Sequence, residues 1–262
     1  MGHTNTQEDI QELTEFLMDY TIAMLSVGTY TARVAKCTTR IGKAFGYDVN
    51  ISIFSKNITI SVVAQDDYSL QRTYVRAYTE SPINFNNISL LSALSWHAYD
   101  EKITLKQLKR LYEKIINKKR YSYVNTLILS CLANAAFCRL FGGDLESMPI
   151  VFVATFIGFN LRKILIMINF DIRFVLAFCA FVASMVAYLG THIIVSATPD
   201  VAIGTSVLFL IPGVYLINSV IDILDGHSLI GISRAVSTLI IISCIAIGLY
   251  ITLSITGIRM EY

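Results

Sequence analysis

Hydrophobic residues are distributed in two different ways along the chain. Up to residue 120 they alternate with polar residues at the spacing of amphipathic helices and strands. From residue 121 onward they form almost continuous runs, long enough to cross a membrane. The pattern therefore predicts two domains: a folded α+β domain over residues 1–120 and a transmembrane domain over residues 121–262.

The first domain is expected to contain two helices, three strands and two further helices. Apolar side chains three and four residues apart indicate the helices, and alternating β-branched residues indicate the strands. Gly28 separates the first two helices, and Gly46 ends the second. The expected elements are helices over residues 8–27 and 29–45, a hairpin formed by VNISIF and ITISVVA, an edge strand over residues 70–79, and helices over residues 86–98 and 104–120.

The second domain contains five runs that meet the criterion of about 20 apolar residues. They cover roughly residues 122–141, 147–161, 174–196, 201–224 and 232–257, and the second run ends at Arg162 and Lys163. The predicted fold class is thus an α-helical integral membrane protein with five transmembrane helices and an N-terminal cytoplasmic α+β domain.

Loop charges predict the orientation of these spans. The connections after the first and third runs contain no Lys or Arg and are expected outside the cell, whereas the connections after the second and fourth contain basic residues and are expected inside. A basic cluster directly before the first run favours contact with anionic lipid headgroups and a cytoplasmic N-terminus. This cluster consists of Lys109, Arg110, Lys114, Lys118, Lys119 and Arg120. The expected location is the cell (inner) membrane.

Composition supports the membrane assignment. The chain is 54% hydrophobic and only 15% charged, with a mean hydropathy of +0.58. Residues 1–120 hold 15 Lys and Arg and 12 Asp and Glu, whereas residues 121–262 hold 6 and 7. These figures exclude intrinsic disorder and a disulfide scaffold. No basic, aromatic surface or binding motif indicates nucleic acid as a partner.

No motif indicates catalysis. The five cysteines form no CxxC pair and no Cys/His metal spacing, so no metal ion or other cofactor is expected. The sequence also has no GxSxG, HExxH or P-loop pattern. We therefore expect no catalytic residues and a protein that is not an enzyme.

The fourth run is interrupted near its centre by Pro212 and Gly213. Proline removes a backbone hydrogen bond, and a break at membrane depth is tolerated only where protein or a water-filled cavity satisfies the backbone. The N-terminus of a half-helix created in this way attracts carboxylates. An ordinary proline kink without a ligand is the alternative, and on Pro-Gly alone it is favoured.

Polar residues after this break shift the balance towards a functional site. Asn218, Asp222 and Asp225 are four and three residues apart and share one helix face, which leads towards Arg234. Ionisable residues in or near a span commonly mark ion or proton paths. Asp222 is the deepest of them and could carry a coupling proton or pair with Arg234. Asp225 and Arg234 are further candidates for ion coupling, although both could be wetted loop residues.

Two asparagines are weaker candidates. Asn134 and Asn160 lie at depth in the first and second runs. They could bind substrate together with Pro212, Gly213 and Asn218, or they could join neighbouring spans by hydrogen bonds.

Three segments carry a family resemblance. PGVYLINSVIDILDGHSLIGISR resembles the signature of the threonine/serine exporter family, in which Pro-Gly is followed by Asn, Asp, Gly, Gly and Arg at similar spacing. GTYTARVAKCTTRIGKAFG, with Gly28, Thr31, Arg33 and Val34, resembles the N-terminal segment of that family, and NAAFCRLFGGD resembles the end of its first span. The segments follow the family's order and the resemblance covers essentially the whole chain, although Ala35 stands where many members have Glu.

The resemblance implies a transport function. The length is closest to the split form of the family, in which an N-terminal-type subunit works with a separate, smaller membrane subunit. It implies export of succinate for the split form and of threonine and serine for the fused form, driven by the proton gradient. All of these substrates carry a carboxylate, which suits a half-helix N-terminus at Pro212.

An odd number of spans also predicts a partner. Many transporters consist of two related halves with the substrate between them, and residues 121–262 contain no repeat that supplies a second half. The chain is therefore expected either to form a homo-oligomer or to join a second integral membrane subunit.

Two classes of function remain open from the sequence. The first is a subunit of a secondary exporter for a small carboxylate, and the second is a membrane-anchored regulatory or scaffold protein that acts through its cytoplasmic domain. The exporter is favoured because a broken span followed by a polar stripe has no use in an anchor.

Overall fold

The computed structural model describes residues 7–54, 56–79, 81–118 and 121–257. Packing divides the chain into two compact units, of which the first contains Met1–Lys119 and Val214–Ala235 and the second contains Arg120–Gly213 and Val236–Tyr262. Residues 214–235 thus pack with the N-terminal segment, although their apolar pattern assigns them to the membrane domain. The division of the chain at residue 120 stays a prediction.

The first unit has the mixed α and β structure that its pattern predicts. Its N-terminal part consists of α1 (Gln7–Ser26), α2 (Thr31–Ala44), β1 (Tyr47–Ile53), β2 (Asn57–Ala64), β3 (Gln71–Ala77), α3 (Phe85–Asp100) and α4 (Leu105–Ile116). Its C-terminal part consists of α9 (Gly213–Leu224), which enters the unit at Val214, and the first turns of α10 (Ser228–Thr256).

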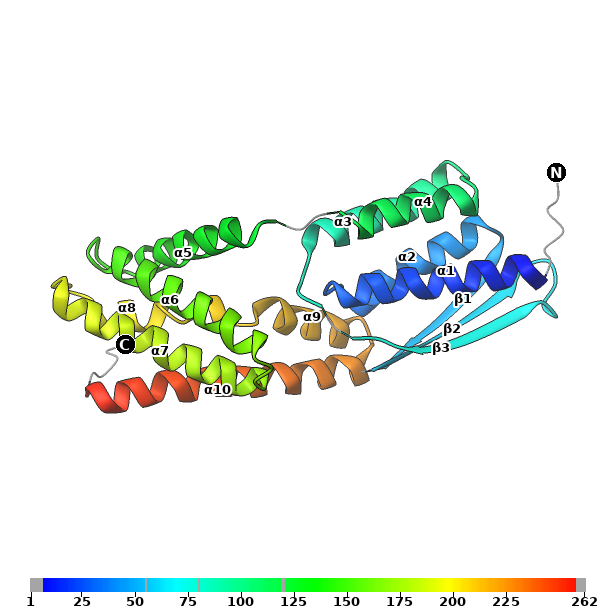
Figure 1. Cartoon of the computed structure of the whole chain (residues 1–262). Helices are drawn as coiled ribbons and strands as arrows, with labels where there is room; N and C mark the ends of the chain where they lie inside the picture. Colours follow the sequence, from blue (N-terminus) through cyan, green and yellow to red (C-terminus); the bar gives the residue numbers. More distant parts are fainter. Residues whose placement is uncertain (1–6, 55, 80, 119–120, 258–262) are drawn as a thin grey trace. The chain divides into compact units, whose positions relative to one another are not determined.

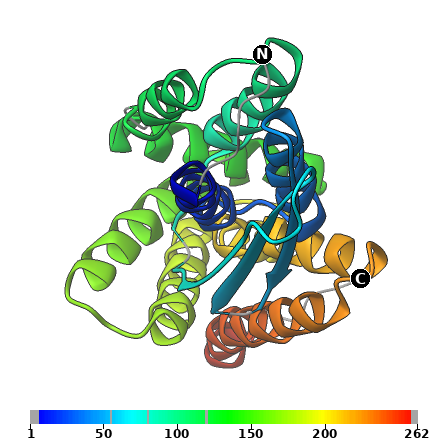
Figure 2. The ribbon, with the colours of Figure 1, turned by 90° about the vertical axis from the view of Figure 1, so that its right-hand side faces the viewer.

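The three strands form an antiparallel sheet in the order β1-β2-β3. Ile60 of β2 pairs with Ile51 of β1 and with Tyr74 of β3. Alternation along β2 buries Ile58, Ile60 and Val62, because successive side chains of a strand point to opposite faces. The helices lie on that buried face (Figures 1 and 2).

The helices of this unit form two layers over the sheet. α1 and α2 pack on the strands, while α3 and α4 pack on α1 and α2 (Figure 1). The core between the layers includes Leu17 and Tyr20 of α1, and the Tyr20 hydroxyl donates to the carbonyl oxygen of Leu91 in α3 at 2.7 Å. α2 is therefore held between the sheet and a second helical layer.

A tight turn at Gly28 connects α1 to α2. Gly28 has φ +92°, a backbone conformation that only glycine adopts readily. A Cβ at this position would lie 2.8 Å from a side-chain carbon of Ile83. Backbone hydrogen bonds from Ser81 to Ser26 and from Asn84 to Val27 fix the segment that follows β3 against the same turn. This turn and the start of α2 form one wall of the polar site that is described below.

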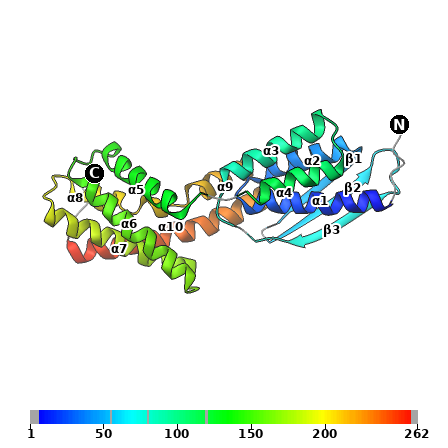
Figure 3. The same cartoon turned by 45° about the horizontal axis from the view of Figure 1, so that its top comes forward.

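The second unit is built from long apolar helices. It contains α5 (Tyr123–Leu140), α6 (Ser147–Met167), α7 (Ile172–Ile193), α8 (Pro199–Thr205), the 3₁₀ turn η1 (Leu208–Leu210) and the later turns of α10. α6 packs between α5 and α7 (Figure 3). Over the described residues, four helices are long and apolar enough to cross a membrane: α5, α6, α7 and α10. A fifth span exists only if the bent pair Pro199–Leu210 and Gly213–Leu224 is counted as one.

The predicted end of the second span is wrong. Arg162 and Lys163 were expected to terminate the helix, but α6 continues to Met167. The Lys163 ammonium group lies 3.6 Å from the ring centroid of Tyr123 in α5, so its charge is partly compensated without a break in the helix. The run of apolar residues in the sequence ends at Arg162 and Lys163, but the helix itself continues past them.

Asp144 joins two loops of the second unit. Its carboxylate accepts hydrogen bonds from the backbone amides of Ser147 and Ala197, at 2.8 and 2.6 Å, and from the Ser196 hydroxyl. Partial burial raises the pKa of the Asp144 carboxyl, but these hydrogen bonds lower it further, and the net pKa lies well below the ordinary value. The α5–α6 and α7–α8 connections are therefore tied together by an ionised aspartate.

Close packing of α10 on α7 depends on Gly248. A Cβ at Gly248 would lie 2.1 Å from the backbone oxygen of Ala177 and 3.0 Å from the Cβ of Ala180. Small residues at such a crossing let two helix backbones approach each other. Near the same contact, Ser184 and Thr252 share a hydrogen bond of 2.7 Å between their hydroxyl groups.

We predict that Gly248→Ala destabilises the protein by about 1–3 kcal/mol, the usual cost of overpacking a tight contact. The measurement is the thermal unfolding midpoint in detergent. The matched control is Ile247→Val, because Ile247 is 55% exposed and a smaller side chain there leaves the helix contact intact. Equal midpoints for the two variants would contradict the packing.

Candidate functional site

The break predicted at Pro212 and Gly213 is present. η1 ends at Leu210, Ile211 and Pro212 lie outside any helix, and α9 starts at Gly213. The Gly213 amide donates to the carbonyl oxygen of Ile211 at 2.9 Å, so the chain turns tightly before the new helix begins. A Cβ at Gly213 would meet no atom within 4 Å. A side chain at position 213 would therefore point into open space.

α9 is apolar on its exposed face and polar on its buried face. The exposed apolar side chains are Leu216, Ile217, Val220, Ile223 and Leu224. The buried polar side chains are Asn218, Ser219 and Asp222. A helix on the surface of a water-soluble protein has the opposite arrangement. This inversion is typical of a helix that faces lipid or another apolar partner and turns its polar groups towards protein.

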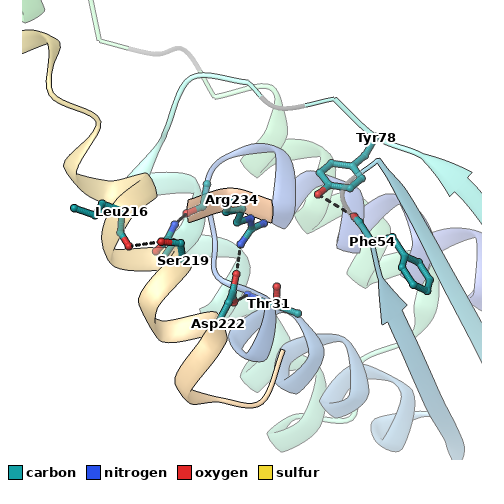
Figure 4. Close-up of polar contacts among 9 residues, drawn as sticks. Thr31, Phe54, Tyr78, Leu216, Ser219, Asp222 and Arg234 are labelled. Atoms are coloured by element: carbon teal, nitrogen blue, oxygen red, sulfur yellow. Dashed lines mark hydrogen bonds and ion pairs between the residues drawn. The ribbon is translucent and has the colours of Figure 1, made fainter. Parts of the chain in front are cut away.

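Asp222 is the centre of the buried polar face. Its side chain is 0% exposed, and one carboxylate oxygen forms an ion pair with Nη1 of Arg234, a side chain that is 12% exposed, at 2.5 Å. The other oxygen accepts a hydrogen bond from the backbone amide of Thr31 at 2.7 Å. Figure 4 shows Arg234 and Thr31 converging on the carboxylate from two different elements. The pairing of Asp222 with Arg234 considered from the sequence is therefore present.

Asn218 makes a second contact with the α1–α2 turn. Its side-chain amide donates to the carbonyl oxygen of Gly28 at 2.8 Å. A small cavity of about 10 Å³, lined in part by Gly28, Asn218 and Arg234, lies beside this contact. That volume is close to the space one water molecule needs. Asn218 and Asp222, one helical turn apart, thus hold both the turn and the first residue of α2.

Two hydroxyl groups at the same turn are buried without a partner. Thr29 and Thr31 are each 2% exposed, and neither side-chain oxygen has a hydrogen bond within the described part of the chain. Leaving a buried hydroxyl unsatisfied is costly, and such groups are rare in folded proteins. The turn therefore has more hydrogen-bonding capacity than its contacts with α9 use.

The remaining predicted residues lie outside this cluster. Asp225 is exposed on the last turns before α10. Asn134 and Asn160 belong to the second unit: Asn134 donates to the Thr155 hydroxyl at 2.9 Å, and Asn160 accepts from the Tyr123 hydroxyl at 3.1 Å. Both asparagines connect α5 with α6, which is the alternative role considered for them.

The partners of Asp222 and Asn218 on α2 and its preceding turn are groups that the sequence did not identify. They are a backbone amide at Thr31 and a backbone carbonyl at Gly28, and neither leaves a side-chain signal. The indirect signal is that both residues lie in GTYTARV, one of the segments with a family resemblance. Within the described residues, no group of three or more His, Cys, Asp or Glu side chains could hold a metal ion.

Comparison with known proteins gives a consistent family. The sequence profile described as "Putative threonine/serine exporter" matches residues 15–256. A probable succinate transporter subunit, YjjP, of Klebsiella aerogenes is 27% identical and covers 94% of this chain and 95% of its own length. The protein of the same description from Escherichia coli K12 is 26% identical over 96% of this chain and 98% of its own length.

A third relative is matched over only part of its length. A probable threonine/serine exporter of Mycobacterium tuberculosis is 23% identical over 98% of this chain, but the match covers only 50% of that relative. No solved structure matches the chain significantly.

The Asp222–Arg234 pair leads to a stability prediction. Asp222→Asn retains an acceptor for the Thr31 amide but leaves Arg234 buried without its counter-charge, which costs about 3–5 kcal/mol. Asp225→Asn is the matched control, because it removes an exposed carboxylate from the same helix region and is expected to cost less than about 0.5 kcal/mol. The measurement is thermal unfolding of the two variants in detergent.

A double variant tests whether the pair acts as a unit. Asp222→Asn combined with Arg234→Gln is expected to be less destabilising than the sum of the two single changes, because neither charge is then left alone. Strictly additive effects would argue against a direct interaction between the two side chains.

Proposed function

The chain belongs to the threonine/serine exporter family, and on that premise we propose that it is one subunit of a secondary exporter. The exporter moves a small metabolite that carries a carboxylate, namely succinate or threonine and serine, out of the cell. Membership of this family implies a transport role rather than an enzymatic one.

One observation carries this proposal: two segments of the family pattern meet in a single buried polar cluster. Asn218 and Asp222 come from the Pro-Gly segment, and Gly28 and Thr31 come from the N-terminal segment. The contacts span 190 and 191 residues of sequence. A simple anchor needs no such cluster, whereas a transporter needs buried polar groups at the helices that change position.

A second membrane subunit is part of the proposal. Two relatives named as a transporter subunit match this chain along nearly their whole length. The relative named as an exporter is about twice as long as the part that matches, because the match covers only 50% of it. We infer that the unmatched half of that relative corresponds to a separate chain that assembles with this one.

The proposed roles of the residues follow from chemistry. The helix start at Pro212 and Gly213, with Asn218 further along α9, would attract the carboxylate of the substrate. Asp222 would couple transport to an ion through its contact with Arg234, because a change in its protonation state alters both of its hydrogen bonds. Asn134 and Asn160 are kept as secondary substrate contacts, and Asp225 as a secondary coupling group.

The proposed location is the inner membrane with the N-terminus in the cytoplasm. Basic residues precede α5, and such residues remain on the cytoplasmic side and attract anionic lipid. In this orientation the α1–α2 turn meets substrate that leaves the cytoplasm.

We predict efflux only when the chain is produced together with its partner subunit. Cells that lack native exporters are loaded with labelled succinate or labelled threonine, and the label released over time is measured. Release of one label identifies the substrate class, and the same release from the chain alone would refute the half-transporter. No release of either label, with both subunits folded in the membrane, would favour the regulatory or scaffold protein.

We predict that Asp222→Asn lowers efflux and uncouples it from the proton gradient, because an amide can neither exchange a proton nor form the ion pair with Arg234. Arg234 forms the ion pair with Asp222, and the backbone amide of His227 donates to the Asp222 carbonyl oxygen. The control is Asp66→Asn, an exposed carboxylate remote in sequence from both segments. A variant that exports normally at every pH would remove Asp222 from the coupling mechanism.

A further inference from the structure

The N-terminus of α2 has no cap of its own. The first turn contains no acidic residue, and the N-cap residue Tyr30 makes no side-chain hydrogen bond. The free amides at the start of a helix carry a partial positive charge and need acceptors. Within the described residues, the Asp222 carboxylate supplies the side-chain acceptor from a position 191 residues away. An aspartate of α9 thus occupies the place that a local capping residue has in most helices.

The groups around the Asp222 carboxylate could also bind the carboxylate of another molecule. Arg234 pairs with its second oxygen, and the guanidinium group has five donors in a geometry that fits carboxylates. The buried hydroxyls of Thr29 and Thr31, which have no hydrogen-bond partner within the described residues, lie in the same turn and in the first residue of α2. The cavity beside Gly28 and Arg234 has room for about one water molecule. The two threonine hydroxyls are hydrogen-bonding groups that the Asp222 carboxylate does not use.

We propose that the start of α2 and Arg234 form a carboxylate-binding site in its own right, which Asp222 occupies in this structure and which the carboxylate of the exported metabolite takes over. The identity of that metabolite rests on the proposed function, whereas the existence of the site does not. The substrate carboxylate must replace that of Asp222 and cannot bind beside it, because two carboxylates next to one arginine repel each other.

Exchange has a structural consequence. Asp222 and Asn218 of α9 bond to the first residue of α2 and to the turn before it. When a free carboxylate binds at the start of α2, Asp222 loses that bond, and α9 is released from the N-terminal part of its unit. The aspartate competes from within the same fold, so a free carboxylate must bind tightly enough to displace it.

Chemical rescue tests the site directly. Asp222→Ala, in the full chain, removes the resident carboxylate and leaves Arg234 and the start of α2 in place. We expect a lowered unfolding midpoint that recovers by about half or more with saturating formate or acetate, since a ligand that binds only the folded state stabilises it. Formamide, which is neutral and similar in shape to formate, and sodium chloride at equal ionic strength should have no such effect.

Two control variants make the result specific. Ser219→Ala changes a buried neighbour whose hydroxyl donates to the carbonyl oxygen of Leu216 in its own helix, and the unfolding midpoint of this variant should not respond to formate. The double variant Asp222→Ala with Arg234→Gln should also fail to respond, because the counter-charge is gone. An Asp222→Ala protein that is destabilised but unaffected by formate, acetate and succinate would overturn the proposal.

A measurement on the unaltered protein covers the case in which Asp222→Ala does not fold. Hydrogen exchange of residues 213–224 should become faster when succinate or threonine is added, and it should not change with the neutral diamide of succinic acid. Unchanged exchange with both carboxylates would overturn the exchange mechanism. Neither assay depends on transport, so failure of the site and failure of the proposed exporter function can be told apart.

Discussion

The buried carboxylate of Asp222 imposes a constraint that several other features of the first unit satisfy. A charged group without access to water is costly unless opposite charge and hydrogen-bond donors surround it. Arg234 supplies the charge, and the first amide of α2 supplies a donor. The start of α2 in turn has no acidic residue of its own and needs an acceptor. Because each group meets the need of the other, one cluster fixes α9, the first turns of α10 and the α1–α2 turn with respect to one another.

This cluster is better explained by specificity than by stability. Well-packed apolar residues stabilise a buried position about as well as an ion pair does, and often better. α9 has many apolar residues, and all of its exposed large side chains are of this kind. Retaining Asp222 on its buried face makes the contact with α2 depend on charge, and a contact that depends on charge can be broken by a proton or by a competing anion.

The sequence predicted local structure well, because local structure follows from local pattern. The alternation in ITISVVA places Ile58, Ile60 and Val62 on one face of β2, and Gly28 and Gly46 mark turns in which glycine has a positive φ. Prediction failed where compensation comes from elsewhere in the chain. Lys163 remains inside α6 because Tyr123 of α5 lies beneath it, and no window over the second span contains that tyrosine.

For a similar reason, the sequence identified the site residues of α9 and α10 but not their partners in the α1–α2 turn. Pro212, Asn218, Asp222 and Arg234 stand out because polar residues are rare in apolar runs. Their partners at Gly28 and Thr31 act through backbone atoms, which every residue has, and a separation of 190 residues gives no periodicity to detect. The resemblance of GTYTARV to a family segment drew attention to this turn, but it did not indicate what the turn binds.

In the proposed mechanism, the two helix starts that could receive a carboxylate are successive positions for the substrate. Gly213, where α9 begins, and Asp222 are nine residues apart on one helix, which corresponds to about 14 Å along its axis. That separation exceeds the length of a four-carbon dicarboxylate, so a single substrate molecule cannot occupy both positions at once. Asp222 occupies the start of α2, whereas a side chain at Gly213 would meet no atom within 4 Å. A substrate that first displaces Asp222 would therefore loosen the helix whose other end it meets next, which would link recognition of a carboxylate to movement of α9.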